Sequence, residues 1–408
     1  MLASHKLTID DVDIFGQKVM VRVDYNVPIE NGIIQDDRRI RASLPTIRKI
    51  LSENGIPILI SHLGRPNGKR NDSLSLAPIA GKLSELLGKP VTFVRDCIGD
   101  EARTARKRAI PGDIFLLENL RFHIEEEEND DDFARELLGE VKIYVNDAFG
   151  TCHRVHASVV AITKYAEYDV AGYLLNKELE MLLRLIENPK RPFTSIVGGA
   201  KVSSKIGIIE NMLDKCDRIL IGGGMAWTFF SSLGIDQGQS LVETDRLDVA
   251  RRILEKAEAH FGLGGRIFLP IDTIVTDDIT GNGIRKVVPY DHVPHGLEAV
   301  DIGPDTVSRY KEEISNSNTI VMNGPLGVFE VDKFSIGTRE VLKSIAERVD
   351  QGGIGIIGGG ETAAAAAKYG LADRMTHIST GGGASLKLLE GKSLPGVDAL
   401  RDRKKFNK

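Results

Sequence analysis

Short runs of β-branched and other apolar residues alternate along the chain with longer segments in which apolar residues recur every three to four positions. The first pattern is typical of buried strands, and the second of helices with one apolar face. Their alternation predicts an α/β protein built around mostly parallel sheets. The expected strands are Lys18–Asp24, Pro57–Ser61, Asp113–Leu117, Val141–Asn146, Thr194–Val197, Arg218–Ile221, Arg266–Leu269, Thr319–Met322, Ile354–Ile357 and His377–Ser379.

The helical periodicity places helices between these strands. The expected helices include Leu44–Glu53, Pro78–Leu87, Ser203–Leu213, Asp245–Ala259, Asp305–Ile314 and Ile336–Val349, with glycine stops at Gly55, Gly88 and Gly262. A further helical segment, Asn176–Ile186, precedes the breaker Asn188-Pro189-Lys190-Arg191-Pro192. We expect this helix to join two lobes, where it would transmit rigid-body motion.

The length of 408 residues predicts two domains, because one domain usually takes about 100 to 200 residues. We expect two Rossmann-like domains. The expected division is an N-terminal domain over 1–175, an interdomain helix over 176–188, a C-terminal domain over 189–392, and a tail over 393–408 that returns to the N-terminal domain.

Composition excludes several classes of protein. The net charge of -5 is mild and argues against a nucleic-acid partner, which usually requires a basic excess on one face. Three widely spaced cysteines do not make a disulfide framework, which favours the reducing cytoplasm. The first residues contain no signal-like apolar region, and no stretch approaches about eighteen consecutive apolar residues, so we expect no membrane contact.

Four glycine clusters follow expected strands in the second half, at 197–201, 221–225, 357–361 and 380–385. Backbone amides that open a helix cradle phosphate, because they offer several donors and the positive end of the helix dipole. The chain contains neither G-x-x-x-x-G-K-[ST] nor a G-x-G-x-x-G that opens a helix after a strand, so it matches neither common nucleotide signature. The clusters nevertheless predict a nucleotide site in this half.

The first half carries basic residues where its expected strands end. They are Arg39, His62, Arg65, Arg121, His153, Arg154 and His156. Ligands of open parallel sheets bind at the carboxyl ends of the strands, and guanidinium groups bind carboxylate and phosphate in a bidentate way. Any one of these residues alone is more often structural. Together they predict a site for a small, multiply anionic acid, so the two halves suggest a two-substrate phosphotransferase.

Lys201 and Lys205 stand four residues apart at the start of an expected helix, so both ammonium groups could reach one polyphosphate. The alternative is a solvated lysine face.

Two other clusters are expected to carry no chemistry. A metal site at Cys152, His153 and His156 is disfavoured because Arg154 would repel a cation. The acidic run Glu125–Glu128 is expected to be a solvated loop and helix start.

Several long motifs make the chain resemble the phosphoglycerate kinase family over nearly its full length. They are VRVDYNVP (Val21–Pro28), SHLGRP (Ser61–Pro66), LLENLRF (Leu116–Phe122), GGAKV…K (Gly198–Lys205), IGGGM (Ile221–Met225), NGPLGVFE (Asn323–Glu330), IGGGET (Ile357–Thr362) and HISTGGGAS (His377–Ser385). The resemblance implies a bilobal, hinge-bending enzyme of glycolysis and gluconeogenesis. Such an enzyme moves the acyl phosphate of 1,3-bisphosphoglycerate onto MgADP, giving ATP and 3-phosphoglycerate.

The resemblance also implies roles for individual residues. The implied phosphoglycerate contacts are Asp24, Asn26, Arg39, His62, Arg65, Arg121, Arg154 and His156. The implied nucleotide contacts are Lys205, Gly222, Gly223, Gly224, Asn323, Glu330, Gly358, Gly359, Gly360, Glu361 and Thr362. The implied catalytic set is Lys201, Arg39, Gly360 and Gly383. Arg39 is preferred over Arg38 because it directly precedes Ile40, as in the R-I pattern of the family.

The chain departs from the family pattern at three positions. Glu361 stands where the family commonly has an aspartate at the metal, so a Mg²⁺ contact is expected there either directly or through water. Ser204 stands where many relatives carry aspartate, and Lys387 where a glutamate is frequent.

The expected chemistry needs no general base, because the carboxylate leaving group is a weak base and the ADP oxygen is already ionised. Positioning and charge neutralisation remain, which suit lysine, arginine, metal and glycine amides. A nicotinamide dehydrogenase and a non-enzymatic anion-binding scaffold are the alternatives. The expected partners are the small-molecule substrates, and the chain is expected to be a monomer or a homodimer.

Overall fold

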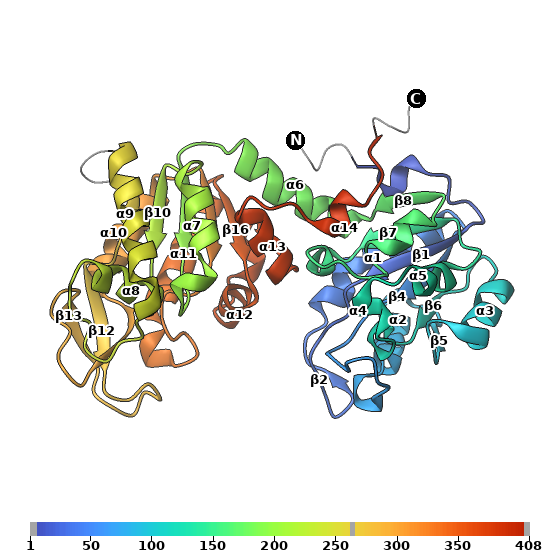
Figure 1. Cartoon of the computed structure of the whole chain (residues 1–408), viewed down its shortest axis with the longest axis horizontal. Helices are drawn as coiled ribbons and strands as arrows, with labels where there is room; N and C mark the ends of the chain where they lie inside the picture. Colours follow the sequence, from blue (N-terminus) through green and yellow to red (C-terminus); the bar gives the residue numbers. More distant parts are fainter. Residues whose placement is uncertain (1–5, 262–265, 404–408) are drawn as a thin grey trace. The chain divides into compact units, whose positions relative to one another are not determined.

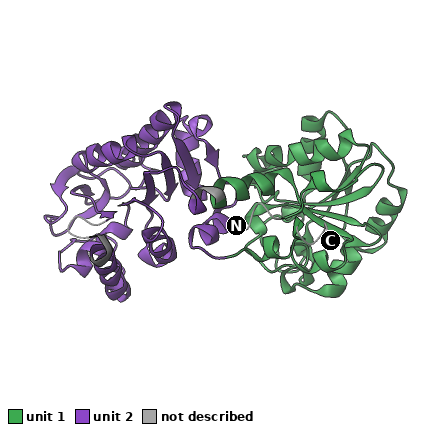
Figure 2. Ribbon diagram, turned by 90° about the horizontal axis from the view of Figure 1, so that it is seen from above, with its two compact units in different colours: residues 1–183, 393–408 green, residues 184–392 purple. Residues whose placement is uncertain are grey.

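A computed structural model of the chain describes residues 6–261 and 266–403, so the expected helix stop at Gly262 lies outside the described residues. The chain divides into two compact units, coloured separately in Figure 2. Unit 1 comprises residues 1–183 and 393–408, and unit 2 comprises residues 184–392. Each unit contains one six-stranded parallel sheet, so the fold class expected from the alternating pattern is confirmed.

The sheet of unit 1 has the order β5-β6-β4-β1-β7-β8. Its strands are β1 (Lys18–Val23), β4 (Ile56–Ile60), β5 (Thr92–Val94), β6 (Phe115–Leu117), β7 (Ile143–Asp147) and β8 (Tyr168–Ala171). The central strands β1 and β4 are almost entirely buried, which explains their continuous apolar sequence. Helices accompany the sheet: α1 (Arg38–Ser52), α2 (Ala77–Leu87), α3 (Gly99–Arg108), α4 (Glu125–Glu128) and α5 (Asp131–Leu138), together with the hairpin of β2 (Ile29–Glu30) and β3 (Ile33–Ile34) (Figure 1).

The sheet of unit 2 has the order β11-β10-β9-β15-β16-β17. Its strands are β9 (Phe193–Val197), β10 (Arg218–Ile221), β11 (Ile267–Phe268), β15 (Thr319–Asn323), β16 (Ile354–Gly358) and β17 (His377–Ile378). The helices of this unit include α7 (Ile206–Leu213), α8 (Met225–Ser232), α9 (Leu247–Phe261), α10 (Pro304–Ser315), α11 (Ile336–Asp350), α12 (Gly360–Lys368) and α13 (Gly382–Leu389). A second, antiparallel sheet has the order β13-β12-β14, from β12 (Asp272–Thr276), β13 (Lys286–Pro289) and β14 (Glu298–Ile302).

Helix α6 (Tyr173–Glu187) contains the boundary between the units and covers the segment expected to join the lobes. Its N-terminus is held in unit 1 by the buried Asp147, which accepts hydrogen bonds from the amides of Leu174 (2.8 Å) and Leu175 (3.2 Å). Gly172 is required beside this cap, because a Cβ there would lie 2.2 Å from Asp147 Oδ1.

The C-terminal tail belongs to unit 1, where α14 (Pro395–Asp398) lies. The buried Lys6 donates to the carbonyl of Leu400 at 2.6 Å, and the Leu7 amide donates to the carbonyl of Arg401 at 2.9 Å. The Arg401 amide in turn donates to Asp169 at 2.6 Å. The segments around Leu7 and Arg401 are therefore attached to each other and to the edge of the first sheet near β8.

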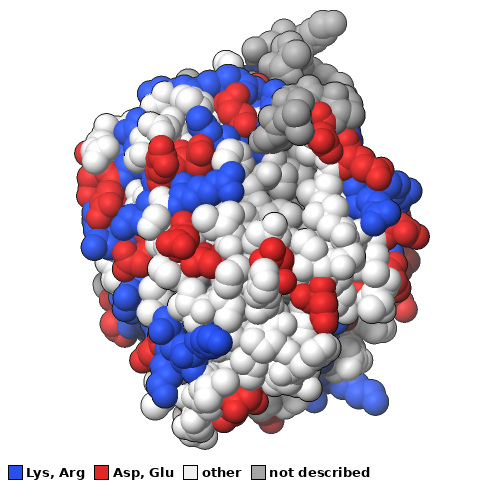
Figure 3. Space-filling view, turned by 90° about the vertical axis from the view of Figure 1, so that its left-hand side faces the viewer, with Lys and Arg blue, Asp and Glu red and all other residues white. Residues whose placement is uncertain are grey.

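The described residues contain no helix that is both long enough and apolar enough to cross a bilayer. The face drawn in Figure 3 shows lysine and arginine beside aspartate and glutamate, separated by uncharged areas. This face therefore carries no large patch of one sign.

Candidate functional site

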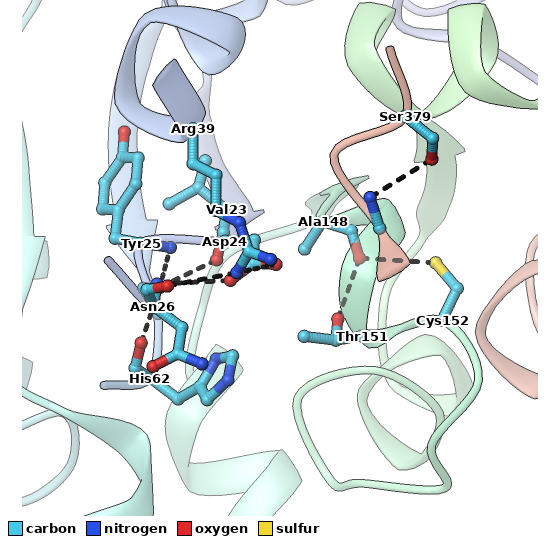
Figure 4. Close-up of polar contacts among 12 residues, drawn as sticks. Val23, Asp24, Tyr25, Asn26, Arg39, His62, Ala148, Thr151, Cys152 and Ser379 are labelled. Carbon is cyan, nitrogen blue, oxygen red and sulfur yellow. Dashed lines mark hydrogen bonds and ion pairs between the residues drawn. The ribbon is translucent and has the colours of Figure 1, made fainter. Parts of the chain in front are cut away.

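The candidate anion site of unit 1 lies where four neighbouring parallel strands end. Asp24 and Asn26 follow β1, His62 follows β4, and Arg121 lies in a short 3-10 turn (Leu120–Phe122) after β6. The order β6-β4-β1-β7 brings these strand ends to one edge of the sheet. Figure 4 shows Arg39 reaching Asp24, with Asn26 and His62 nearby.

Arg39 rather than Arg38 points into this cluster. Its Nη1 donates to Asp24 Oδ2 at 3.0 Å and to the carbonyl of Asn26 at 3.1 Å. Arg38 is instead exposed and pairs with Asp36. The Asn26 side chain accepts from the Gly64 amide at 2.9 Å, which ties the β1 loop to the β4 loop.

His62 is buried and neutral. Burial and the positive charges of Arg22, Arg121, Arg154 and Arg39 hold the pKa of its imidazole well below the usual range. The Nη2 of Arg22 lies 3.1 Å from His62 Nδ1. Since a guanidinium can only donate, Nδ1 accepts this bond and the other ring nitrogen carries the proton.

Arg121 is 2% exposed and incompletely paired. Its Nη1 donates to the carbonyl of Gly64 at 2.7 Å, and Nε lies 3.3 Å from Glu127. Its buried Nη2 has no hydrogen-bond partner among the described residues. Burial lowers the pKa of Arg121 to about 10, against the opposing charge of Glu127. A buried cation with a free donor is costly unless an anion completes its bonds, so Arg121 points to a ligand.

The remaining basic residues of the cluster differ in exposure. Arg65 is exposed in the loop after β4, and Arg154 is half-buried. His156 is buried, and its Nδ1 lies 3.7 Å from Glu126. The expectation of a wholly solvated acidic run was wrong at Glu126, which is 0% exposed because its carboxylate accepts from the Ser158 amide and hydroxyl.

The candidate anion site of unit 2 lies at the switch point of its sheet, between β9 and β15. Chain connections run from β9 toward β10 and β11 on one side, and from β15 toward β16 and β17 on the other. Ligands of such sheets bind at this place. The loops that follow β9 and β15 touch through backbone, since a Cβ on Gly198 would lie 2.1 Å from the Pro325 carbonyl and one on Gly324 would lie 2.1 Å from the Gly198 carbonyl.

A cavity of about 460 Å³ opens at this switch point. Its lining is Gly199, Ala200, Lys201, Ser204, Lys205, Asn323, Gly324, Gly359, Gly360, Glu361, Thr362, Gly382 and Leu386. Helices α12 and α13 both begin here, and a Cβ built on Gly382 would lie 3.7 Å from the Gly360 amide nitrogen. Two positive helix ends and two lysines therefore face one cavity, which suits a polyphosphate.

The two lysines occupy different local structures. Lys201 is exposed and precedes a short 3-10 turn (Val202–Ser204), whereas Lys205 is half-buried and precedes α7. They are thus not successive turns of one helix, as the spacing predicted, but both line the cavity. Lys205 Nζ donates to Asn323 Oδ1 at 2.5 Å, and burial lowers the pKa of Lys205 while Glu361 and Glu390 oppose this.

Asn323 completes the floor of the cavity. Its side chain is 2% exposed, and Nδ2 has no hydrogen-bond partner among the described residues. Thr362 is buried beneath it and accepts from the Gly324 amide at 2.7 Å, which fixes the loop after β15.

Some of the expected nucleotide residues do not line this cavity. The clusters of 221–225 and 198–201 pack backbone to backbone, because Cβ atoms on Gly223 and Gly224 would lie 2.7 Å from the Gly199 carbonyl and 2.8 Å from the Ala200 carbonyl. Glu330 is exposed, and its carbonyl accepts from Lys368 at 3.3 Å. Gly358 ends β16, and the exposed Gly383 is the second residue of α13.

Glu361 is the carboxylate of the cavity that fits a magnesium ion. It is exposed and is the second residue of α12. Mg²⁺ is usually held by one or two carboxylates together with substrate phosphates and water, so a single glutamate beside a polyphosphate site is a sufficient protein donor.

Asp96, Cys97 and His123 form another group of possible metal ligands, in unit 1. Asp96 Oδ1 already accepts from His123 Nε2 and from the Cys97 amide, each at 2.7 Å. These bonds account for the group as a hydrogen-bonded turn before α3.

Sequence reasoning did not select Arg22, Ser158 or Glu126 as supporting groups of the site in unit 1. Arg22 had a usable signal, because it is a charged residue within the apolar run of β1. Its burial at 0% shows that it must be paired inside the protein.

Comparisons with known proteins agree with the motifs. The family model described as phosphoglycerate kinase matches residues 9–392. The phosphoglycerate kinase of Chloroherpeton thalassium is 49% identical over 97% of this chain and 99% of its own length. That of Synechococcus elongatus is 51% identical over 96% of both chains.

Solved structures give the same result. The phosphoglycerate kinase of Coxiella burnetii has a TM-score of 0.87 and 38% identity, covering 99% of this chain and all of that one. The phosphoglycerate kinase of Pyrococcus horikoshii has a TM-score of 0.84 and 34% identity, covering 97% of this chain and 98% of that one.

Proposed function

Because the chain belongs to the phosphoglycerate kinase family, we propose that its two anion sites bind the two substrates of one phosphoryl transfer, the nucleotide in unit 2 and the phosphoglycerate in unit 1. The enzyme transfers the acyl phosphate of 1,3-bisphosphoglycerate to ADP and thereby forms 3-phosphoglycerate and ATP in glycolysis. The observation that carries the nucleotide assignment is the meeting of two helix N-termini with Lys201 and Lys205 at the switch point of the second sheet.

In the nucleotide site the phosphates lie over the amides that begin α12 and α13. Lys205, held by Asn323, fixes one phosphate, and Lys201 is exposed and able to follow the transferring group. The clusters around Gly223 and Gly358, together with Glu330, support the rest of the nucleotide. Glu361 would hold a magnesium ion beside the phosphates, and such an ion would neutralise charge on the phosphate oxygens.

In the phosphoglycerate site the acid lies against the strand ends of unit 1. The free Nη2 of Arg121 and the guanidinium groups of Arg39, Arg65 and Arg154 offer donors to its carboxylate and phosphate. His62 adds a neutral donor, and Asp24 keeps Arg39 in place. His156 is buried against Glu126, so we assign it a supporting role.

The transfer requires no proton to be removed. The acyl phosphate leaves a carboxylate, and the attacking ADP oxygen is already ionised. Lys201, Arg39 and the amides of Gly360 and Gly383 stabilise the charge that spreads over the transferring phosphoryl group. Closure of the two sites on each other excludes water, which would otherwise hydrolyse the acyl phosphate.

We also place the enzyme in the cytoplasm. Cys97, Cys152 and Cys216 are free and buried, as is common in proteins of a reducing compartment.

The assignment of the two sites is tested by removing one donor from unit 1. Arg154→Ala should weaken 3-phosphoglycerate binding about 10- to 150-fold, or about 1.5 to 3 kcal/mol, because it removes a charge-assisted hydrogen bond. ADP affinity should hardly change. Isothermal calorimetry with both ligands measures this, and Arg108→Ala, an exposed arginine of α3, is the matched control. Equal weakening of both ligands would contradict the assignment.

A further inference from the structure

A continuous chain of buried polar groups lies behind His62. Arg22 on β1 donates from Nε to the Ser158 hydroxyl at 2.9 Å and from Nη2 to His62 Nδ1 at 3.1 Å. The Ser158 hydroxyl donates to Glu126 Oε1 at 2.7 Å, and the Ser158 amide donates to Oε2 at 2.8 Å. Arg22, Ser158 and Glu126 are each 0% exposed.

We propose that Glu126, Ser158 and Arg22 act as positioning residues that hold His62 as the neutral imidazole protonated on Nε2, with that N–H available to the anion at the strand ends. The proposal rests on the proposed role of His62 as a phosphoglycerate contact. None of the three supporting residues needs to touch the substrate.

The direction of each hydrogen bond between Glu126, Ser158, Arg22 and His62 follows from which of these groups can donate and which can accept. Arg22 can only donate, and a serine hydroxyl has a single proton to give. Ser158 must therefore give its hydroxyl proton to Glu126 and accept from Arg22. At the other end, Nδ1 of His62 must accept, which leaves the ring proton of the neutral imidazole on Nε2.

The surroundings of His62 oppose the doubly protonated form. Arg22, Arg39, Arg121 and Arg154 all act on the imidazole as positive charges, and burial adds to their effect. A second proton on the ring would also displace the bond from Arg22. The imidazole can therefore serve as a donor without adding another charge to a site that already contains several guanidinium groups.

Glu126 explains why Arg22 can remain fixed at this depth. A buried guanidinium needs a nearby anion and partners for its N–H groups. The third nitrogen of Arg22, Nη1, donates to the Val23 carbonyl, so each nitrogen has a partner. Glu126 also anchors the segment after β7, because its backbone carbonyl accepts from the Ala157 amide at 2.9 Å.

The test compares Ser158→Ala with Ser158→Thr and Glu126→Gln. Ser158→Ala removes the hydroxyl that links Arg22 to Glu126, with the smallest change of side-chain volume. Ser158→Thr keeps a hydroxyl at this position. Glu128→Gln is the matched control, because Glu128 belongs to the same acidic run but is exposed. Nitrogen-15 spectra of the histidine rings of the free protein report the tautomer, and steady-state kinetics report KM and kcat.

In the wild-type protein His62 should show one tautomer, protonated on Nε2, across neutral pH. Ser158→Ala and Glu126→Gln should mix the two tautomers and raise the KM for 3-phosphoglycerate about 5- to 20-fold, the loss of one aligned hydrogen bond. The KM for ATP should change by less than about twofold. Ser158→Thr should restore both the tautomer and the KM.

A wild-type His62 protonated on Nδ1 would overturn the proposal, whatever the substrate affinity. So would a Ser158→Ala protein that is folded by circular dichroism and keeps the wild-type spectrum. A changed tautomer with unchanged 3-phosphoglycerate binding would show that the hydrogen-bonded groups do orient His62. In that case the assignment of His62 as a substrate contact would be wrong.

Discussion

At the scale of single residues, the two lysines of unit 2 differ in exposure, and we expect them to serve different purposes. Lys205 is half-buried and bonded to Asn323, so its position is fixed before a nucleotide binds. Lys201 is exposed at the mouth of the same cavity. A mobile cation at the cavity mouth can form its best contact with the phosphoryl group while that group is in transit.

Lys201→Ala should therefore lower kcat about 100- to 1,000-fold, or about 3 to 4 kcal/mol, with only modest changes in KM. The reason is that the lost interaction is strongest in the transition state. A coupled assay with 3-phosphoglycerate and MgATP, monitored through glyceraldehyde-3-phosphate dehydrogenase and NADH, measures both constants. Lys343→Ala, an exposed lysine on α11, is the control. A kcat within threefold of wild type would remove Lys201 from the catalytic set.

The buried Asp301 should make the stability of unit 2 depend on pH. Its carboxylate is buried in unit 2 and accepts from the amides of Gly337 (2.8 Å) and Ile302 (2.9 Å). Burial nevertheless raises its pKa from 3.8 to about 8. The folded protein therefore holds this proton more tightly than the unfolded chain, so the group stabilises the fold fully below about pH 3.8 and this contribution is lost as pH rises through about 8.

Asp301→Asn should remove this pH dependence, because asparagine does not titrate. The free energy of unfolding of the variant should therefore lie below that of wild type at pH 5, and the difference should shrink by pH 9. Urea unfolding monitored by Trp227 measures it, because this single tryptophan is buried in α8 of the same unit. A deficit that stays constant or grows with pH would show that Asp301 is ionised throughout.

The sequence indicated most charged groups of the candidate sites but not their supports. Arg121 was accessible to inference because it stands in a motif directly after a strand, and Arg39, in the first turn of α1, because it precedes Ile40 as in the family pattern. The role of Glu126 could not be inferred, because it is one of four consecutive glutamates. Nothing in the sequence shows which of them contacts Ser158, which lies about thirty residues later. Such pairing is a tertiary property, and it overrides the preference of a lone carboxylate for solvent.

At the scale of elements, the glycine loops of unit 2 are shaped by close backbone approach. Gly324 has φ +97 and lies against Gly198, whereas Gly352 has φ +90 and open space around it. Both positions have a positive φ, which disfavours any residue with a Cβ, but only Gly352 has space for one. They form a matched pair for separating the two effects.

Gly352→Ala should cost about 1 to 2 kcal/mol, the usual penalty of a side chain at positive φ, and should leave activity unchanged. Gly324→Ala should cost more and should also weaken ADP binding, because its Cβ would force apart the loops that follow β9 and β15. Trp227-monitored unfolding and ADP calorimetry measure the two effects. If both variants lose the same free energy of unfolding and bind ADP as wild type does, the close approach of the two loops is not needed for the nucleotide site.

The periodic pattern predicted the parallel strands well, because burial on both faces produces continuous apolar runs. Most observed strands begin or end within two residues of the expectation, as at β10 and β16. The two edge strands of the first sheet, β5 and β8, were not predicted, and neither were the β2–β3 hairpin and the antiparallel sheet β13-β12-β14. In β13 most residues are exposed, so its sequence lacks the apolar run on which the inference depends.

At the scale of the whole molecule, the motifs identified the family because they extend through both units and each contributes several consecutive residues. The length and the breaker after α6 suggested two lobes, and the chain divides within α6, between Leu183 and Arg184. The motifs imply hinge bending through the family resemblance, but they do not give the populations of the open and closed states, which depend on the free-energy difference between them.

We expect the two units to close on each other only when both substrates are bound. Direct transfer requires the reacting atoms of ligands bound to different units to approach within about 3.5 Å. One ligand alone contacts one unit, so it has little preference for the closed state, whereas both together favour closure strongly. Small-angle scattering of the free, singly liganded and doubly liganded protein should show a clear decrease in the radius of gyration only when 3-phosphoglycerate and nucleotide are both present. An identical radius in all four states would mean that α6 does not act as a hinge and that the substrates meet in another way.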